Sequence, residues 1–382
     1  MRSSGSLTGN RHTTHITQHT NESISMTTTV VSDRITVTLA EAADLIVACP
    51  ENRFLLQGEP GTGKTSLAEI IRQRTGFYTA VLDCGAMDIG DAAIPMPVND
   101  TKTLEYYLNS ILGLHTGEPV ALFLDELTKA PPPVFGMFHP LLESYNPRMG
   151  NRLLPKGSII VMTGNLDSDG VGDSLLAHSK MRVTKLEISK PTVPEWLPWA
   201  ADNNIHPIVM AWADRNRDCA ASYRDGGQDN NPYIFLPNKV QGAVWTWRSA
   251  ERCSNLIWKR DKFSANGLLA AMAGTVGTAA ATSLSAFIRH SDSLTPWKEI
   301  MDAPTTAAIP EHQGALAVMV FSALERVQNK EELTSFMTYI KRADPEWQCV
   351  FCIALAKHQK KQGMAFTCKP FTVWCAENQD LL

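Results

Sequence analysis

Short apolar runs alternate with helix-forming stretches along residues 30–189. That alternation is typical of βαβ units, in which helices connect the strands of a parallel sheet. The apolar runs are nearly continuous, which indicates strands that are covered on both faces of the sheet. We expect strands at 52–57, 78–83, 120–124, 158–163 and 185–188, and helices directly after Lys64, at 103–112 and at 134–144.

The pattern changes near Lys190-Pro191, after which most segments have helical periodicity. A polar stretch at 214–232 predicts an exposed loop, and an amphipathic run at 314–327 begins a last helical section. We therefore expect an α/β core, an α-helical lid domain and a helical C-terminal extension. Their predicted boundaries are 26–190, 191–300 and 301–382.

The first 25 residues differ from the rest of the chain. They are rich in Ser, Thr, His and Asn, and a second methionine, Met26, directly precedes the first β-branched run. A segment with so few apolar residues cannot bury enough surface to fold. We expect residues 1–25 to be a disordered leader or an over-extended start.

Composition and charge narrow the class of protein. Hydrophobic residues make up 44% of the chain and charged residues 19%, as in ordinary globular proteins. The 35 basic and 39 acidic residues leave a net charge of −4, and no dense stripe of Lys and Arg is present. This balance argues against a domain that binds nucleic acid mainly through its phosphates, although local basic patches are compatible with it.

Cysteine usage and hydropathy indicate a cytoplasmic protein. Eight cysteines are scattered through a chain that shows no secretory signal, so reduced thiols are favoured over a disulfide framework. Residues 264–288 carry no charge, but Gly, Ala, Ser and Thr dominate them. Such a stretch is too weakly hydrophobic for a membrane span, and we interpret it as a pair of soluble helices.

Four of the cysteines could form a zinc site, because Cys349 and Cys352 have suitable spacing and Cys368 and Cys375 follow. The first pair, however, lies in the apolar helical run 347–355, where buried thiols are common. We therefore favour core cysteines over a metal site. The histidines show no comparable ligand spacing.

A phosphate-binding loop follows the first predicted strand. The sequence Gly58-Glu59-Pro60-Gly61-Thr62-Gly63-Lys64-Thr65 matches G-x-x-x-x-G-K-[ST], and a helix-forming stretch begins at Ser66. The glycines let backbone N–H groups turn toward phosphate oxygens, and the helix directs its positive end at the same anion. We expect this loop to bind ATP, with Lys64 at the β- and γ-phosphates and Thr65 as a ligand of Mg²⁺.

Two acids end the apolar strand predicted at 120–124. Asp125 lies at the carboxyl edge of the expected sheet, where open α/β folds bind their ligands, and we expect it to help hold Mg²⁺. Glu126 follows directly and can act as the general base that activates water. The loop and the acid pair together predict a nucleotide site with hydrolytic chemistry.

At these motifs the sequence resembles the AAA+ ATPases, and more narrowly the MoxR-like group, over most of the chain from about residue 39. In that family the strand after the acid pair ends in a polar residue that positions the lytic water. Asn165, after the apolar run 159–162, matches that residue. The resemblance therefore implies that Asn165 works beside Glu126.

The resemblance also assigns roles to arginines. The stretch 174–188 is similar to the one in which an arginine precedes the last core strand and reaches a neighbouring subunit's γ-phosphate. Arg182 matches this arginine, with Arg148 and Arg152 as competitors. Residues 244–251 are similar to the lid motif in which Thr-Pro-Arg opens a helix, so that Arg248 is expected at the nucleotide although Trp247 replaces the proline.

Taken together, the motifs and the resemblance predict Mg²⁺-dependent ATP hydrolysis by a ring that remodels or assembles a protein partner, and the resemblance implies that the ring is a hexamer. A nucleic-acid-dependent motor or loader is the alternative. A scaffold that binds ATP without hydrolysis is disfavoured by the presence of both acids, Asp125 and Glu126. The sequence does not identify the partner, because this fold serves many clients.

Overall fold

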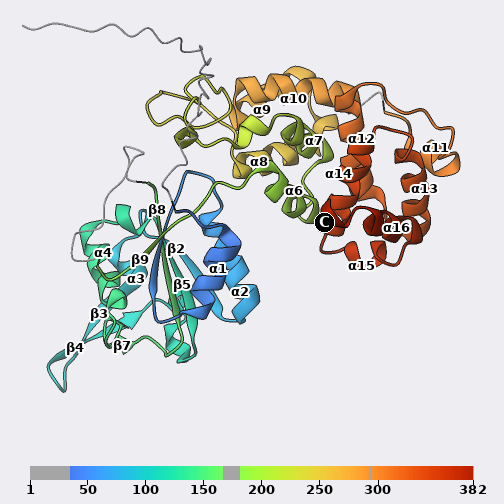
Figure 1. Ribbon diagram of the computed structural model, residues 1–382. Helices are drawn as coiled ribbons and strands as arrows, with labels where there is room; N and C mark the ends of the chain where they lie inside the picture. Colours follow the sequence, from blue (N-terminus) through green and yellow to red (C-terminus); the bar gives the residue numbers. More distant parts are fainter. Residues whose placement is uncertain (1–34, 167–180, 292–293, 382) are drawn as a thin grey trace, which may run out of the picture. The chain divides into compact units, whose positions relative to one another are not determined.

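The computed structural model describes residues 35–166, 181–291 and 294–381 (Figure 1). Residues 36–382 group into one compact unit. The leader predicted at 1–25 and the part of the arginine-containing stretch at 174–180 lie outside the described residues.

A five-stranded parallel sheet forms the first part of the fold. Its strands lie in the order β2 (Tyr78–Asp83), β5 (Val120–Asp125), β8 (Ile159–Gly164), β1 (Arg53–Gln57) and β9 (Thr184–Glu187). Every pairing between these strands is parallel. The expected α/β class and all five expected strands are confirmed. No strand end differs from its expected position by more than one residue.

Helices cover both faces of this sheet, as the continuous apolar runs predict (Figure 1). In β5, Ala121 and Phe123 belong to one buried cluster, and Leu122 and Leu124 belong to another. Side chains alternate along a strand, so these clusters are the two faces of the sheet. The first cluster includes residues of α1 (Leu39–Ala48) and α2 (Leu67–Thr75), and the second includes residues of α3 (Ile89–Ala92), α4 (Pro132–Phe138) and the 3₁₀ helix η5 (His139–Leu142).

A β-hairpin replaces the helix expected at 103–112, which is wrong. β3 (Ala93–Val98) and β4 (Thr103–Leu108) pair antiparallel as a separate two-stranded sheet. Thr and the adjacent tyrosines of β4 favour extended backbone once a partner strand is present, and this pairing is a tertiary effect that a helical pattern does not reveal. A second small antiparallel pair joins β6 (Arg148–Met149) to β7 (Arg152–Leu153).

The chain after residue 192 is helical, as expected. The α-helices are α6 (Val193–Asp202), α7 (Pro207–Arg215), α8 (Trp247–Ile257), α9 (Ala265–Val276), α10 (Thr278–Ser291), α11 (Trp297–Asp302), α12 (Gln313–Arg326), α13 (Lys330–Ile340), α14 (Pro345–Ala356), α15 (Gln362–Ala365) and α16 (Lys369–Glu377). One continuous apolar core joins them, and α12 packs against α7, α10 and α14 within it. The polar stretch at 216–232 holds only two short 3₁₀ helices, η7 (Arg217–Ala220) and η8 (Tyr223–Asp225).

Two weaker expectations also have outcomes. Residues 264–288 fold as α9 and most of α10, and no helix among the described residues is long and apolar enough to cross a membrane. Cys349 and Cys352 lie on α14, and Cys352 is buried against Met337. Within the ranges that the structure describes, no group of three or more His, Cys, Asp or Glu side chains could hold a metal ion.

Candidate nucleotide site

The phosphate loop lies between β1 and α2. β1 ends at Gln57, and the loop reaches the 3₁₀ helix η1 (Lys64–Ser66) that leads into α2. Gly61 and Gly63 have φ angles of 77° and 90°, a left-handed conformation that favours glycine. The loop therefore lies between a strand and a helix, as a phosphate-binding loop requires. Its backbone N–H groups lie at the start of that helix.

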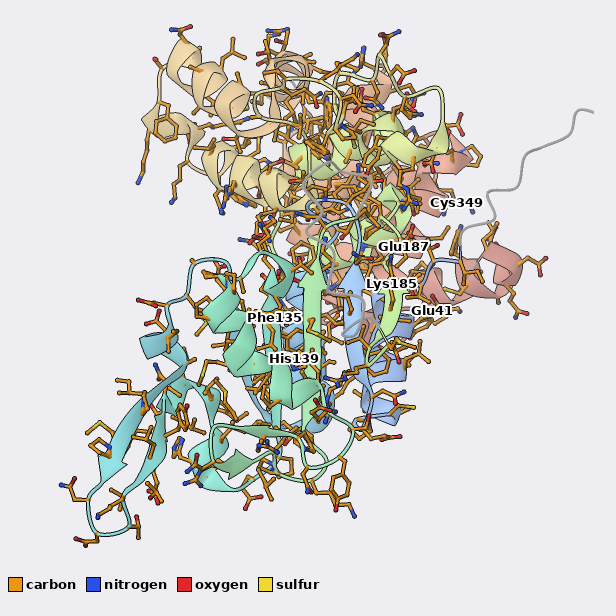
Figure 2. All side chains as sticks on the ribbon, turned by 90° about the vertical axis from the view of Figure 1, so that its left-hand side faces the viewer. Glu41, Phe135, His139, Lys185, Glu187 and Cys349 are labelled. Atoms are coloured by element: carbon orange, nitrogen blue, oxygen red, sulfur yellow. The ribbon has the colours of Figure 1, made fainter. Side chains whose placement is uncertain are left out.

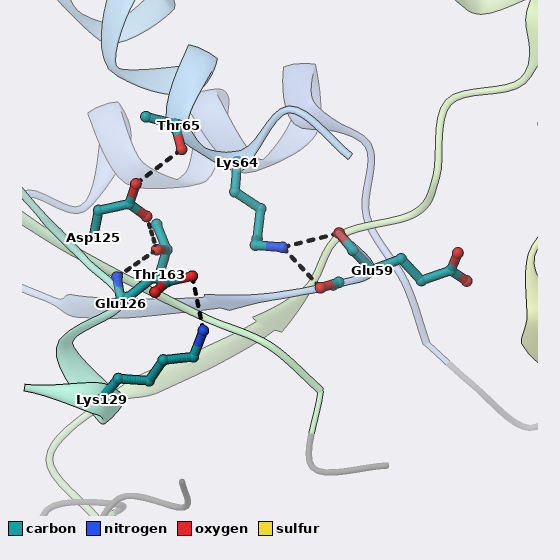
Figure 3. Close-up of polar contacts among 8 residues, drawn as sticks. Glu59, Lys64, Thr65, Asp125, Glu126, Lys129 and Thr163 are labelled. Carbon is teal, nitrogen blue, oxygen red and sulfur yellow. Dashed lines mark hydrogen bonds and ion pairs between the residues drawn. The ribbon is translucent and has the colours of Figure 1, made fainter. Parts of the chain in front are cut away.

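Lys64 lies across its own loop. Its Nζ atom donates to the main-chain oxygens of Gly58 at 2.7 Å and Glu59 at 3.0 Å (Figure 3). The neighbouring Ser66 donates from its hydroxyl to the Gly63 oxygen at 2.7 Å, and Thr62 donates to the Glu59 oxygen at 3.1 Å. These bonds hold the loop in a closed bend with the ammonium group facing its carbonyls.

Thr65 and Asp125 meet although 60 positions separate them in sequence. The Thr65 hydroxyl donates to Oδ2 of Asp125 at 3.1 Å (Figure 3). Asp125 is the last residue of β5, so the sheet places it beside the beginning of η1. A hydroxyl and a carboxylate are oxygen ligands of the kind that Mg²⁺ prefers, and their proximity fits a site in which both hold this ion.

Glu126 has a different environment from its neighbour. Its φ angle is 51°, an unusual left-handed conformation for a residue with a side chain. The Lys129 ammonium lies 2.9 Å from Oε1 of Glu126, whose side chain is 43% exposed. The carboxylate is thus accessible to a water molecule, and Lys129 orients it (Figure 3).

Thr163 connects the two acids, and the sequence reasoning missed it. Its hydroxyl donates to Oδ1 of Asp125 and accepts the main-chain N–H of Glu126 at 3.1 Å (Figure 3). The residue is 1% exposed at the end of β8. A hydroxyl side chain directly after the apolar run 159–162 is a signal from which a role for Thr163 could have been predicted. The role at the end of this strand was assigned to Asn165 instead.

Asn165 follows β8 and lies next to β1 in space. Its main-chain oxygen accepts a hydrogen bond from the Gln57 side chain at 3.0 Å. Its own side chain forms no hydrogen bond to any other residue within the described ranges. The structure therefore places Asn165 at the carboxyl edge of the sheet with its amide available, two residues beyond Thr163.

Arg182 is engaged within its own chain. It forms an ion pair with Glu143 at 2.8 Å and contacts Nε2 of His139 at 3.2 Å. His139 and Phe135, one helical turn before it, have ring centroids 5.8 Å apart (Figure 2). The side chain of Arg182 is half-buried beside η5, where its ion pair with Glu143 holds it.

The competing arginines, Arg148 and Arg152, are exposed in β6 and β7. Within the described part of the chain, neither has a hydrogen bond or ion pair through its side chain. Arg148 and Arg152 are therefore accessible to a neighbouring molecule. Arg182 would first have to break its ion pair with Glu143.

Helix α8 places Arg248 near the phosphate loop. Thr246 caps the helix, and its hydroxyl accepts the Ser249 N–H at 3.0 Å. A Cβ atom built on Gly61 would lie 2.7 Å from Cβ of Thr246, so the loop and the cap are in close contact. Arg248 is exposed, with no hydrogen bond or ion pair to a residue that the structure describes.

Trp247 stands where the similar lid motif of the AAA+ proteins has a proline. Its indole stacks on Trp196 with ring centroids 4.5 Å apart and donates to the Pro191 oxygen at 3.2 Å. The side chain is 8% exposed. Packing by Trp247 and the cap at Thr246 fix the start of the helix that a proline would otherwise favour.

A cysteine also lies next to the acids. Burial raises the pKa of the Cys84 thiol to about 12, and the nearby Asp125 and Asp83 carboxylates add to the shift. Its main-chain N–H donates to the Asp125 oxygen at 2.9 Å. Cys84 therefore stays protonated at neutral pH and packs behind the site, and it supplies no nucleophile.

Comparison with known proteins agrees with this geometry. Residues 53–168 match the family model of the AAA domain, dynein-related subfamily. No curated protein matches the chain. The matched segment contains the phosphate loop, both acids and Asn165, and lies in the sheet described above. The fold is that of a P-loop AAA+ protein, and the chain is an ATPase.

Two solved structures are distantly similar to this chain. A proline-to-glycine mutant of Thermotoga maritima RuvB is 18% identical, with a TM-score of 0.35, over 70% of this chain and 76% of that chain. NtrX from Brucella abortus in complex with ADP is 12% identical, with a TM-score of 0.36, over 91% of this chain and 70% of that chain. Likeness at this level carries no argument about function.

Proposed function

We propose that the chain is an AAA+ ATPase that hydrolyses ATP with Mg²⁺ in a homo-oligomeric ring, a hexamer, to remodel or assemble a protein partner. Within the AAA+ proteins we place it in the MoxR-like group, on the residues quoted from its sequence. We also propose that it acts in the cytoplasm.

The observation that carries the proposal is the meeting of Thr65 with Asp125. A phosphate loop alone could bind an anion, but a hydroxyl from the loop placed 3.1 Å from a carboxylate at the sheet edge is a paired oxygen site for a cation. Lys64 lies on the same loop. The three side chains together fit a triphosphate that carries its metal ion.

Each residue has a distinct role in the proposed reaction. The loop residues Gly58 to Ser66 bind the phosphates, and Lys64 turns from its own carbonyls to the β- and γ-oxygens. Thr65 and Asp125 hold Mg²⁺, which neutralises charge on the phosphate oxygens when it is bound. Thr163 keeps Asp125 in the orientation that this requires.

Water activation falls to Glu126. Its exposed carboxylate accepts the proton as water attacks the γ-phosphorus, while the Asn165 amide positions that water. Lys129 holds Oε1 of Glu126, so the second carboxylate oxygen faces the reaction. Arg248, exposed on the lid helix, neutralises phosphate charge.

The ring requires an arginine from the neighbouring subunit, and we propose Arg182 for that role. Its pair with Glu143 must open before the guanidinium can reach another subunit. Arg148 and Arg152 are the competitors, and their exposure makes them accessible without such a step. Single Arg→Ala variants distinguish the three. The variant that lacks the trans-acting arginine should be inactive alone and should regain turnover when mixed with Glu126→Gln subunits, whose intact arginine completes the site of the variant.

A protein partner is supported by the surface of the β3–β4 hairpin. Ile94, Met96 and Tyr107 share one face of it by their pairing and are between 45% and 67% exposed, and the hairpin extends from the sheet (Figure 1). Clustered exposed apolar side chains are typical of protein contacts. Nucleic acid would instead require basic side chains, of which the hairpin has one, Lys102, at its turn.

Glu126→Gln tests the proposal. The substitution keeps the shape of the side chain and removes the base, so Mg²⁺-dependent binding of a fluorescent ATP analogue should stay within about twofold while turnover falls at least about 100-fold. Lys64→Ala is the control, and should lose binding itself. Normal hydrolysis by Glu126→Gln would contradict the assignment.

The same variant can identify the partner. With ATP bound and not hydrolysed, the ring should retain a client protein through a pull-down, and size measurement should give the oligomeric state. ATPase activity that rises with DNA or RNA and weakens steeply with salt would instead favour the nucleic-acid motor.

A further inference from the structure

A segment of the helical part lies against the phosphate loop through contacts that the nucleotide site does not explain. Among the described residues, the segment 219–225, between α7 and α8, has polar contacts with Lys190, Glu187 and Glu59 on the side of the sheet. Lys190 donates to the Ala221 oxygen at 2.8 Å, and Arg224 forms an ion pair with Glu187 of β9. Figure 2 labels Glu187 on its strand. The third contact joins Ser222 to Glu59 inside the phosphate loop.

Local structure fixes the direction of the Ser222 hydroxyl. Ser222 caps the 3₁₀ helix η8, and its Oγ accepts the Arg224 N–H at 3.1 Å. Its own N–H donates to the Asp225 carboxylate at 3.1 Å. Since the acceptor side of the hydroxyl is occupied by the cap, its proton is directed to Oε1 of Glu59.

Glu59 transmits this contact to Lys64, the lysine of the phosphate loop. Its side chain points away from Lys64 (Figure 3), while its main-chain oxygen accepts the Lys64 ammonium at 3.0 Å and the Thr62 hydroxyl at 3.1 Å. The Glu59 side chain is thus bonded to the helical part, and the Glu59 main-chain oxygen is bonded to Lys64 and Thr62. A displacement of Ser222 would move the carbonyl to which Lys64 is bonded.

The electrostatic surroundings make this bond more than a surface contact. Glu59 is 7% exposed, and a buried carboxylate requires hydrogen-bond donors. Burial lowers the pKa of the neighbouring Lys190 ammonium, and the negative charges of Glu59 and Asp225 oppose that shift. Loss of the Ser222 donor would remove one hydrogen bond from this buried carboxylate, and the loop would rearrange to compensate.

We infer that Ser222 is a positioning residue for ATP binding, acting through Glu59 on Lys64, so that the segment 219–225 couples the helical part to the phosphate loop. The inference rests on the proposed function, since it assumes that Lys64 binds ATP phosphates. It adds a second contact between the helical part and the loop, separate from the contact between Thr246, the cap of α8, and Gly61.

Ser222→Ala should raise the dissociation constant for a fluorescent ATP analogue with Mg²⁺ about tenfold, the effect of losing one hydrogen bond to a charged group. Ser222→Thr keeps the hydroxyl and should stay within about twofold of the wild type. Ser264→Ala is the matched control, because Ser264 caps α9 by accepting the Gly267 N–H at 3.1 Å and has no contact with the loop. It should lose thermal stability comparable to Ser222→Ala and keep wild-type ATP affinity.

Glu59→Ala gives a second route to the same result. If the contact acts as inferred, Glu59→Ala combined with Ser222→Ala should weaken binding no more than the stronger single variant, since both remove one interaction. Wild-type ATP affinity in folded Ser222→Ala, or additive losses in the pair, would overturn the inference and leave Ser222 as a helix cap. Absence of ATP binding by the wild-type protein would overturn the proposed function itself.

Discussion

The carboxyl edge of the sheet and helix α12 hold their side chains in opposite ways. At the sheet edge, Thr65, Asp125 and Thr163 are connected by hydrogen bonds between polar atoms. In α12, ten of the 14 residues are buried, and all of them are apolar or glycine. Directional bonds fix where an atom lies, whereas apolar packing fixes how stable the surrounding structure is.

This difference separates function from stability within one chain. A polar side chain at the sheet edge contributes a small net free energy to folding but sets the position of a reacting group. A core side chain of α12 contributes several kcal/mol to folding and contacts no part of the site. Substitutions in the two regions should therefore change different measurements.

The largest effect is expected in α12. Phe321 is 1% exposed, and Phe321→Ala should lower the free energy of unfolding by about 3–5 kcal/mol, because it leaves a cavity in a packed core. Urea denaturation measures the loss. Phe263→Ala, at a site 45% exposed, is the matched control and should change stability by less than about 0.5 kcal/mol.

The contrast between the two regions would be wrong if folded Phe321→Ala protein had a much lower turnover number than the wild type. Assayed at a temperature at which the variant is fully folded, its ATPase activity should remain within about twofold of the wild type, since distant sites act independently.

Thr163→Val is the counterpart at the sheet edge. The substitution keeps the shape of the side chain but removes the hydroxyl that holds Asp125 and the Glu126 N–H. The Mg²⁺ concentration for half-maximal ATPase activity should rise about 10- to 100-fold, as for the loss of other residues that orient metal ligands. ATP binding measured without Mg²⁺ should be unchanged, which separates positioning from loss of fold.

Two variants sharpen that result. Thr163→Ser restores the hydroxyl and should recover most of the Mg²⁺ affinity. Thr75→Val removes a hydroxyl of the same domain that donates to the Ile71 oxygen at 2.8 Å, away from the acids, and should leave the Mg²⁺ dependence as in the wild type. Equal Mg²⁺ dependence in Thr163→Val and the wild type would show that Thr163 only packs.

The contrast also explains what could be predicted from sequence. The strands at 120–125 and 159–164 were predictable because a strand covered on both faces must be apolar at every position, and the two acids mark where β5 leaves the core. The phosphate loop was predictable because its chemistry requires fixed residues at fixed spacing. Each of these signals is local in the sequence.

Features that depend on distant partners were not predictable. Thr163 acquires its importance from the β5–β8 pairing, which brings it beside Asp125 38 positions away. Strand β4 was mistaken for a helix because its partner β3 determines its conformation. Ser222 and Glu59, 163 positions apart, show no relation in the sequence at all.

The smallest effect concerns pH and lies again in the helical part. Burial lowers the pKa of His206 to about 3, with a smaller contribution from the Arg260 charge. The imidazole is neutral in the folded protein, and its Nδ1 accepts the Ile208 N–H at 3.1 Å at the start of α7. In the unfolded chain His206 binds a proton below about pH 6.5, whereas in the folded protein it stays neutral. The contribution of His206 to stability is therefore complete above about pH 6.5 and is lost as the pH falls toward 3.

His206→Asn tests this assignment, because asparagine also caps helices but does not titrate. Between pH 6.5 and 5 the wild type should lose up to about 1.4 kcal/mol of unfolding free energy per pH unit more than the variant, the limit for one proton. Urea denaturation across that range measures the difference, and the other titrating groups, His358 among them, cancel between the two proteins. If the unfolding free energy of the wild type and of His206→Asn changed equally with pH, His206 would accept a proton in the folded state. Burial at the start of α7 would then not keep its ring neutral.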